Sequence, residues 1–279
     1  MSEPELDSPA AIETQEPAQL SPALASRLRE FTSARIALRR SSVSLATSEV
    51  LDFQLAHGRA RDAVHLPLQP ANFLPALRKV ANSEPLLLHS AAVDRPTYLK
   101  RPDLGRKLNE VSRRRLETLA NPVCDLAIVL ADGLSALAVE RNVEPLLAEL
   151  LPMLKLAFPG MTLAPLCVVE QGRVAIGDEI ANLLSAELAI VLIGERPGLS
   201  SSDSLGAYIT WQPQPGLTTD AERNCISNIR AEGLSYAQAT ARLLHYIREA
   251  REKGLTGVAL KDPGEPQLAL DAPNQGGPQ

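Results

Sequence analysis

The sequence has few of the residues that mark disulfide-stabilised, nucleic-acid-binding or membrane proteins. Its 279 residues include three cysteines, Cys124, Cys167 and Cys225, too few and too scattered for a disulfide framework or a paired-cysteine metal site. Aromatic residues make up 3% and the formal net charge is −5, which argues against base stacking and against a basic nucleic-acid surface. No apolar run approaches the roughly 20 residues of a membrane span. The acidic start predicts no secretory signal, so we expect a cytoplasmic protein.

The two ends of the chain differ in composition from its middle. Residues 1–19 are acidic, contain prolines and lack Lys and Arg, and residues 263–279 are rich in Pro and Gly. Such segments bury too little surface to offset the entropy of ordering them. We therefore predict four parts: an acidic disordered tail (1–19), an N-terminal helical region (20–84), a Rossmann-like domain (85–262) and a disordered C-terminal tail (263–279).

The N-terminal region carries helical signals. Leu24, Leu28 and Phe31 recur at helical spacing behind a possible cap at Ser21. The predicted helices of this region and its continuation cover residues 22–33, 47–64, 70–82 and 103–119.

From about residue 85 short apolar runs alternate with helical stretches. The runs cover residues 86–88, 126–130, 163–169, 188–193, 207–211 and 257–260, with helices between them at 143–157, 178–185 and 236–252. Most of these runs do not alternate with polar residues, as is typical of parallel strands buried on both faces. We predict an α/β fold, a doubly wound, mostly parallel Rossmann-like sheet with an N-terminal helical extension.

Polar, glycine-bearing turns follow three of the predicted strands. They are Asp132-Gly133, residues 170–178 and residues 194–201, and a fourth polar segment covers 219–229. Each has a plain structural interpretation: glycines serve turn geometry, Asp132 caps a helix, and Glu195 with Arg196 forms an exposed pair. Because doubly wound sheets bind ligands at the carboxyl ends of their strands, three such turns on one edge favour a ligand site.

Several familiar motifs are absent. The sequence has no GxGxxG, no phosphate-binding GxxxxGK[ST] and no HExxH, and Cys225 has no neighbouring histidine. The basic run 113–115 is typical of a solvated or subunit-facing helix. The residues alone leave three classes open: a cofactor-binding enzyme subunit, a free-standing α/β enzyme that uses Cys225 or Asp132, and an assembly protein.

Longer segments carry a resemblance to a known family. The matching segments include Leu51-Asp52-Phe53-Gln54-Leu55-Ala56-His57, Arg101-Pro102-Asp103-Leu104-Gly105-Arg106, Ala131-Asp132-Gly133-Leu134-Ser135-Ala136, Val169-Glu170-Gln171-Gly172-Arg173-Val174, Gly194-Glu195-Arg196-Pro197-Gly198-Leu199-Ser200 and Arg223-Asn224-Cys225-Ile226-Ser227-Asn228-Ile229. With these segments the sequence resembles the small (light) subunits of ethanolamine ammonia-lyase over about residues 35–262.

The resemblance implies a function that composition and spacing do not supply. Family members belong to bacterial adenosylcobalamin-dependent enzymes that convert ethanolamine to acetaldehyde and ammonia by a radical mechanism. The large TIM-barrel subunit does the chemistry, and the small subunit completes the cobalamin site in a hetero-oligomer. By resemblance, Val174, Glu195 and Cys225 contact the cofactor, and this chain supplies no catalytic residue.

Further expectations concern the metal and the location. The sequence lacks the Asp-x-His-x-x-Gly motif of proteins that ligate cobalt through histidine. We therefore expect base-on adenosylcobalamin, no metal ligand from this chain, and no nucleic-acid or membrane partner. Backbone N–H groups near Gly172 and Gly194 are further candidate contacts. Packaging in a bacterial microcompartment, as in some family members, is left open.

Overall fold

The computed structural model describes most of the chain between its two ends. Contacts divide the chain into two units, Met1–Gln54 and Leu55–Gln279, which we describe separately. The predicted tails, 1–19 and 263–279, lie outside the described residues. The described ranges are 21–32, 34–38, 40–41, 44–119 and 123–260.

The first unit contains short elements held by local polar contacts. The Ser21 hydroxyl accepts a hydrogen bond from the Leu24 N–H at 3.3 Å, which caps the first helix as its sequence predicts. Arg29 donates to the carbonyl of Ala37 at 2.6 Å and lies 3.5 Å from the Glu49 carboxylate. The elements are α1 (Pro22–Glu30), the antiparallel pair β1 (Arg40–Ser41) and β2 (Ser44–Leu45), and the start of α2 (Thr47–His65).

The second unit is built on a six-stranded sheet with the order β3-β5-β4-β6-β7-β8. The first four strands in that order pair in parallel, and β7 and β8 pair antiparallel. The structure confirms the predicted α/β class with its mostly parallel sheet. The strands are β3 (Leu86–His89), β4 (Cys124–Ala131), β5 (Cys167–Glu170), β6 (Ala186–Gly194), β7 (Leu205–Trp211) and β8 (Arg223–Ile229).

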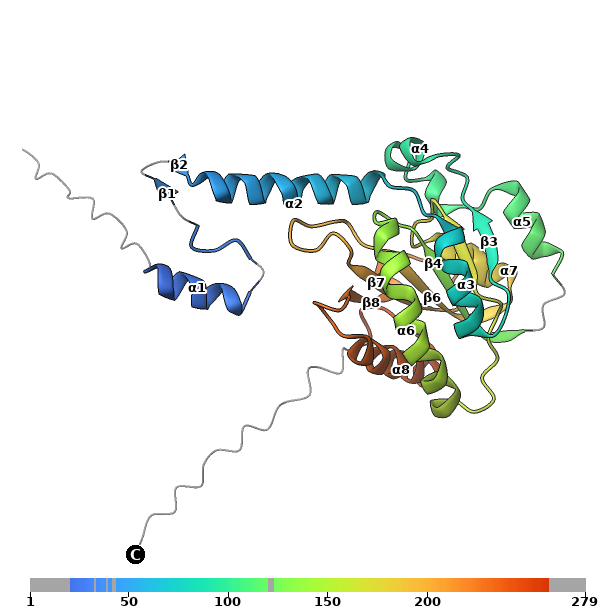
Figure 1. The fold of residues 1–279 in the computed structure, drawn as a ribbon. Coiled ribbons are helices and arrows are strands. Elements are labelled where there is room, and N and C mark those ends of the chain that lie inside the picture. The colour runs from blue at the N-terminus through green and yellow to red at the C-terminus, as the bar shows by residue number, and fades with distance from the viewer. Residues whose placement is uncertain (1–20, 33, 39, 42–43, 120–122, 261–279) are drawn as a thin grey trace, which may run out of the picture. The chain divides into compact units, whose positions relative to one another are not determined.

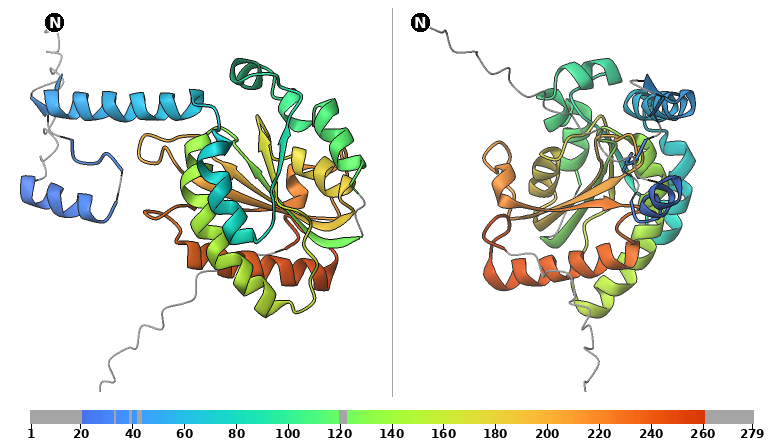
Figure 2. Two further views of the ribbon diagram at one scale, coloured as in Figure 1. Left: turned by 45° about the vertical axis from the view of Figure 1, so that its right-hand side comes forward. Right: turned by 90° about the vertical axis from the view of Figure 1, so that its left-hand side faces the viewer.

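Helices cover both faces of this sheet (Figures 1 and 2). Side chains of α3, α6 and α8 share one apolar cluster with the sheet, and those of α5 and α7 share a second cluster on the opposite face. Both clusters draw on β4 and β6, so the central residues of these two strands are apolar on both faces. The helices are α3 (Pro70–Ala81), α4 (Arg95–Lys100), α5 (Glu110–Glu117), α6 (Ala136–Ala157), α7 (Ile176–Leu183) and α8 (Tyr236–Lys253).

One predicted strand is wrong and one real strand was missed. Residues 257–260 form a turn, which the buried Asn224 amide holds by donating to the carbonyls of Gly257 and Leu260. The polar segment 219–229 instead contains β8. As an edge strand with exposed residues on one face, β8 has no continuous apolar run, so the pattern used for buried strands missed it.

The predicted helix 103–119 is also wrong in extent. The chain instead forms the short helix η1 (Leu104–Arg106) and then α5, which begins behind the Asn109 side chain. The contact division falls at Gln54, and the predicted division at residue 85 stays a prediction. None of the helices within the described ranges has the length and hydropathy that crossing a bilayer requires.

Candidate ligand-binding site

The crevice between the carboxyl ends of β4 and β5 is the first place to look for a ligand. After β4 the chain passes to α6 on one face, and after β5 it passes to α7 on the other. Ligands of doubly wound sheets occupy such a switch point. Here Asp132 lies in the crevice with no exposed surface. Its carboxylate accepts the Gly172 N–H at 2.9 Å and lies 3.4 Å from Arg95.

Helix α4 closes this crevice from within the chain. Arg95 donates to the carbonyls of Gly133 and Val64, both at 2.8 Å, and its guanidinium lies 4.8 Å from the centre of the Tyr98 ring. The Tyr98 hydroxyl donates to the Gly172 carbonyl at 3.2 Å. The usual ligand position is therefore filled by the protein itself. The Gly172 N–H, a predicted ligand contact, is already used by Asp132.

Burial dominates the electrostatics of this crevice. It raises the pKa of the Asp132 carboxyl to about 6, although Arg95 and the N–H groups of Gln171 and Gly172 oppose the shift. Burial also lowers the pKa of the Arg95 guanidinium. The Arg95 Nη2 atom has no hydrogen-bond partner among the described residues. The pair links α4 to the loop after β4 inside the protein.

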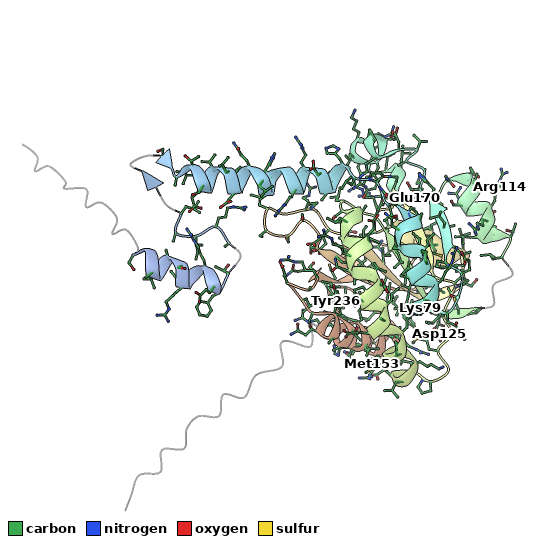
Figure 3. The ribbon with its side chains drawn as sticks, in the orientation of Figure 1. Lys79, Arg114, Asp125, Met153, Glu170 and Tyr236 are labelled. Carbon is green, nitrogen blue, oxygen red and sulfur yellow. The ribbon has the colours of Figure 1, made fainter. Side chains whose placement is uncertain are left out.

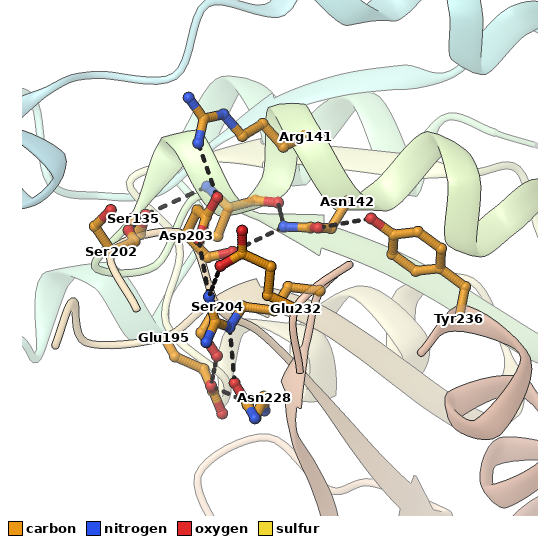
Figure 4. Close-up of polar contacts among 12 residues, drawn as sticks. Ser135, Arg141, Asn142, Glu195, Ser202, Asp203, Ser204, Asn228, Glu232 and Tyr236 are labelled. Carbon is orange, nitrogen blue, oxygen red and sulfur yellow. Dashed lines mark hydrogen bonds and ion pairs between the residues drawn. The ribbon is translucent and has the colours of Figure 1, made fainter. Parts of the chain in front are cut away.

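Glu195, which follows β6, has a different environment. Its side chain lies over Gly206, where a Cβ would come within 3.1 Å of Oε1. Oε2 accepts hydrogen bonds from the Ser204 hydroxyl and, at 3.1 Å, from the Asn228 N–H (Figure 4). Oε1 has no donor among the described residues, and the side chain is partly exposed. One carboxylate oxygen is thus positioned by the protein and the other is available to a ligand.

Cys225 lies in the middle of β8, on the same face of the sheet. It pairs with Tyr208 of β7, which pairs in turn with Val191 of β6, so the three side chains share one face. Cys225 is exposed, and its Sγ lies 3.4 Å from the Ser227 hydroxyl. Burial raises the pKa of the half-buried Tyr208 phenol, and the nearby Cys225 thiol and Glu195 carboxylate raise it further. Both predicted contact residues therefore lie close to Tyr208.

Val174 lies two residues before α7, and its side chain packs against the same apolar cluster as Tyr208. Gly177 packs so closely on β6 that a Cβ would come within 2.3 Å of the Val191 side chain. Asp178 forms a buried two-point ion pair with Arg223 of β8, with both N–O distances at 2.7 Å. The start of α7 is thus tied to β6 and to β8.

These contacts define one surface, which we call the open face. It consists of Val174, Glu195, Tyr208, Cys225 and Ser227. Helix α7 packs mainly on β4 and β6, and α8 covers β7 and β8 from the opposite side, so the side chains of Cys225 and Ser227 stay exposed. The structure places Glu195 and Cys225 near Tyr208, and it places Val174 on the same side of the sheet, against the same apolar cluster as Tyr208. That these residues contact a cofactor stays a prediction.

The open face carries side chains of several chemical kinds. It offers an apolar side chain, a carboxylate acceptor, a thiol and a phenol, and no His, Lys or Asp stands beside Cys225 in the described strands β7 and β8. No group of His, Cys, Asp and Glu side chains in the described ranges is arranged to hold a metal.

The sequence analysis did not identify three residues that lie on the open face or hold Glu195 in place. Tyr208 carries a signal that could have been used, because Gly206, Tyr208 and Thr210 alternate with apolar residues along β7. Ser204 and Asn228 carry none, because their contact with Glu195 depends on the turn after β6 and on the end of β8.

The fold is that of an α/β protein, and its candidate ligand contacts lie on an open surface rather than in a closed cleft. The family model of the ethanolamine ammonia-lyase light chain matches residues 23–261. The chain is 57% identical over 253 residues to the ethanolamine ammonia-lyase small subunit of Pseudomonas paraeruginosa, covering 89% of this chain and 91% of that protein. It is 56% identical over 242 residues to the protein of that name from Azotobacter vinelandii, covering 86% and 88%. The chain belongs to the ethanolamine ammonia-lyase light chain family.

Proposed function

We propose that this chain is the small subunit that completes the cobalamin site of an ethanolamine ammonia-lyase, and that Val174, Glu195 and Cys225 contact the corrinoid. The family and the names of the relatives support the enzyme. One observation carries the role of the residues: side chains distant in sequence border one open face. By its name, a small subunit acts with a larger one, which supplies the substrate site.

The chemistry of the open face fits a corrinoid. The corrin ring is broad and largely apolar, and its edge carries neutral amides, so it needs apolar contact and a few polar anchors. Val174 and Tyr208 supply apolar surface, and Glu195 Oε1 can accept an amide N–H. When bound, adenosylcobalamin supplies the radical that starts the reaction, and this chain binds and orients it. That the cobalt stays base-on and unligated by this chain is still a prediction.

The shape of the open face explains the need for a partner. Ligand sites bury roughly 70–90% of their ligand. The face leaves Cys225 and Ser227 exposed, so it supplies only one wall. The proposed large subunit supplies the opposite wall, which means that the isolated chain neither encloses the corrinoid nor turns over ethanolamine.

A binding measurement on the two-subunit complex tests this proposal. We expect Glu195→Ala to weaken adenosylcobalamin binding about 10- to 100-fold, because it removes a charged hydrogen-bond acceptor. Glu187, exposed at the opposite end of β6, is the matched control, and Glu187→Ala should leave the affinity within about twofold. The measurement is an equilibrium titration followed by the corrinoid absorption spectrum.

Three outcomes contradict the proposal. Equal affinities for the Glu195→Ala and Glu187→Ala complexes would remove Glu195 from the site. Turnover of ethanolamine by the isolated chain would favour the alternative of a free-standing enzyme. Corrinoid binding that needs only the large subunit would leave this chain an assembly role.

A further inference from the structure

One buried ion pair joins helix α7 to the edge strand β8. Asp178, in the first turn of α7, and Arg223, the first residue of β8, make a two-point contact in which both N–O distances are 2.7 Å. Each of the two side chains is 2% exposed. Arg223 also donates to the Thr210 hydroxyl at 3.0 Å, which extends the contact to β7. Among the described residues, no other hydrogen bond or ion pair links α7 to β8.

The ion pair is close in sequence to two of the predicted corrinoid contacts. Cys225 follows Arg223 by two residues on β8, so their side chains lie on the same face of the sheet. Val174 precedes Asp178 by four residues, and the turn between them is held by the Gly177 N–H, which donates to the Val174 carbonyl at 3.1 Å. A shift of Asp178 relative to Arg223 would therefore move Val174 relative to Cys225.

The chemistry of the pair suits positioning better than it suits stability. Removing two charges from water offsets much of their attraction, and apolar side chains of similar volume often replace a buried ion pair without loss of stability. A two-point contact between a guanidinium and a carboxylate is directional and fixes both distance and orientation. Apolar contacts are non-directional. The pair thus supplies a precision of placement that the apolar packing of α7 does not.

We propose that Asp178 and Arg223 are positioning residues for the corrinoid, which fix the spacing of Val174 and Cys225 without touching the cofactor themselves. The proposal rests on the proposed function, because it assumes that Val174 and Cys225 contact the corrinoid. The two buried side chains offer a ligand almost no surface, so they act through their neighbours. Binding groups need to be held within about 0.5 Å of their productive positions, which a directional pair achieves.

Replacing the pair by apolar side chains separates positioning from stability. The variant Asp178→Val/Arg223→Met leaves no unpaired buried charge, so the complex of both subunits should keep its thermal unfolding midpoint within about 4 °C. We expect its affinity for adenosylcobalamin to fall about 10-fold, because Val174 and Cys225 are no longer held in register. The affinity is measured by equilibrium titration followed by the corrinoid absorption spectrum, and the midpoint by circular dichroism.

A conservative variant tests the two-point geometry and remains informative if the double variant does not fold. Arg223→Lys keeps the positive charge, but an ammonium group cannot make the paired contacts of a guanidinium. We expect it to weaken adenosylcobalamin binding about threefold, less than the double variant does. An affinity equal to that of the wild type would show that the two-point contact is not needed.

The matched control applies the same pair of substitutions to another ion pair between a helix and a strand. Arg251 of α8 lies 3.2 Å from Asp125, near the amino end of β4. Figure 3 shows Asp125 at the end of the sheet away from Glu170, which ends β5. Asp125→Val/Arg251→Met should leave the adenosylcobalamin affinity within about twofold of the wild type, because this pair does not join α7 to β8.

Truncating the proposed contacts shows whether the pair acts through them. On the proposed function, Val174→Ala/Cys225→Ala weakens adenosylcobalamin binding about 10-fold. In that background Asp178→Val/Arg223→Met should cost less than about threefold more, because the groups that the pair positions are already lost. A full further 10-fold loss would mean that the pair acts by another route, and it would overturn the proposal.

Other results would also contradict the positioning role. Unchanged affinity in the Asp178→Val/Arg223→Met complex would do so. A loss of affinity that matches the unfolded fraction of the complex at the same temperature would leave the pair a structural role only. If Val174→Ala/Cys225→Ala does not weaken binding, the proposed function loses these contacts and the positioning role falls with them. If that variant weakens binding and the pair variant does not, the positioning role fails and the proposed function stands.

Discussion

Two carboxylates follow neighbouring strands of the same sheet, and their environments are opposite. Asp132, after β4, is fully buried and is held by Arg95 and the Gly172 N–H. Glu195, after β6, is held through one oxygen and keeps the other available. The crevice that doubly wound sheets commonly use is therefore filled by side chains of this chain, and the proposed binding surface lies further along the sheet. Position at the carboxyl edge is not enough to make a residue a ligand contact.

The largest difference between the two residues should appear in stability. Asp132→Ala leaves the buried Arg95 guanidinium without its counter-charge, and we expect the free energy of unfolding to fall by about 3–5 kcal/mol. Glu195→Ala, whose side chain is partly exposed, should cost about 1 kcal/mol. Urea unfolding followed by circular dichroism measures both. Equal losses would show that the buried carboxylate has no special structural role.

The pH dependence of stability should separate the carboxylates next. The pKa of Asp132 is raised from 3.8 to about 6 in the folded chain, so the folded chain holds this proton more tightly than the unfolded chain. Its contribution to stability is therefore greatest below the unfolded pKa and declines by up to about 3 kcal/mol as the pH rises to about 6.

The reference for this measurement is Asp132→Asn, which cannot titrate. The unfolding free energy of the wild type minus that of Asp132→Asn should decrease between about pH 4 and about pH 6 and then level off. A difference that is flat across this range, or that increases with pH, would contradict the raised pKa.

The support beneath Glu195 should give a smaller effect. Ser204 is buried and its hydroxyl donates to Glu195, so Ser204→Ala removes one hydrogen bond and should cost about 1 kcal/mol of stability. On the proposed function it also weakens corrinoid binding, but less than Glu195→Ala does. Ser200→Ala, an exposed position of the same loop, is the control and should change neither quantity.

Cys225 should show the smallest effect of all, and its comparison with Cys167 gives the clearest contrast in exposure. Cys225→Ser should alter the unfolding free energy by no more than about 0.5 kcal/mol, because the side chain is exposed. Cys167→Ser buries a hydroxyl and should cost about 1–3 kcal/mol. Iodoacetamide should label Cys225 in the native subunit before Cys124 and Cys167, since burial raises the pKa of the Cys167 thiol to about 12. Faster labelling of Cys167 would contradict the described sheet.

Much of the fold could be predicted because its central strands have an unambiguous pattern. The runs at 126–130 and 188–193 lie within β4 and β6, and they are apolar at every position because both faces of the strands are buried there. β8 was not predicted because an edge strand keeps polar side chains on its exposed face and so has no continuous apolar run. The turn at 257–260 was mistaken for a strand because its short apolar run packs beside Asn224 without pairing.

Less of the candidate site than of the fold could be predicted from the sequence. The turns after β4, β5 and β6 were identified as one edge, and the resemblance added Val174, Glu195 and Cys225 by position. Nothing in the residues showed that Arg95, far from Asp132 in sequence, would occupy the crevice between β4 and β5. Long-range polar contacts of this kind depend on how α4 packs, which local patterns do not encode.

By itself, the sequence determined the class of fold, because strand and helix periodicities follow from which residues avoid water. It also determined the family, through segments that stand in the same order along the chain. Only the tertiary structure decided which carboxylate is buried and paired inside the protein and which one is partly exposed. The reason is that burial and pairing are properties of the packed molecule: the same side chain is a structural anchor where the chain supplies its partner, and a binding group where it does not.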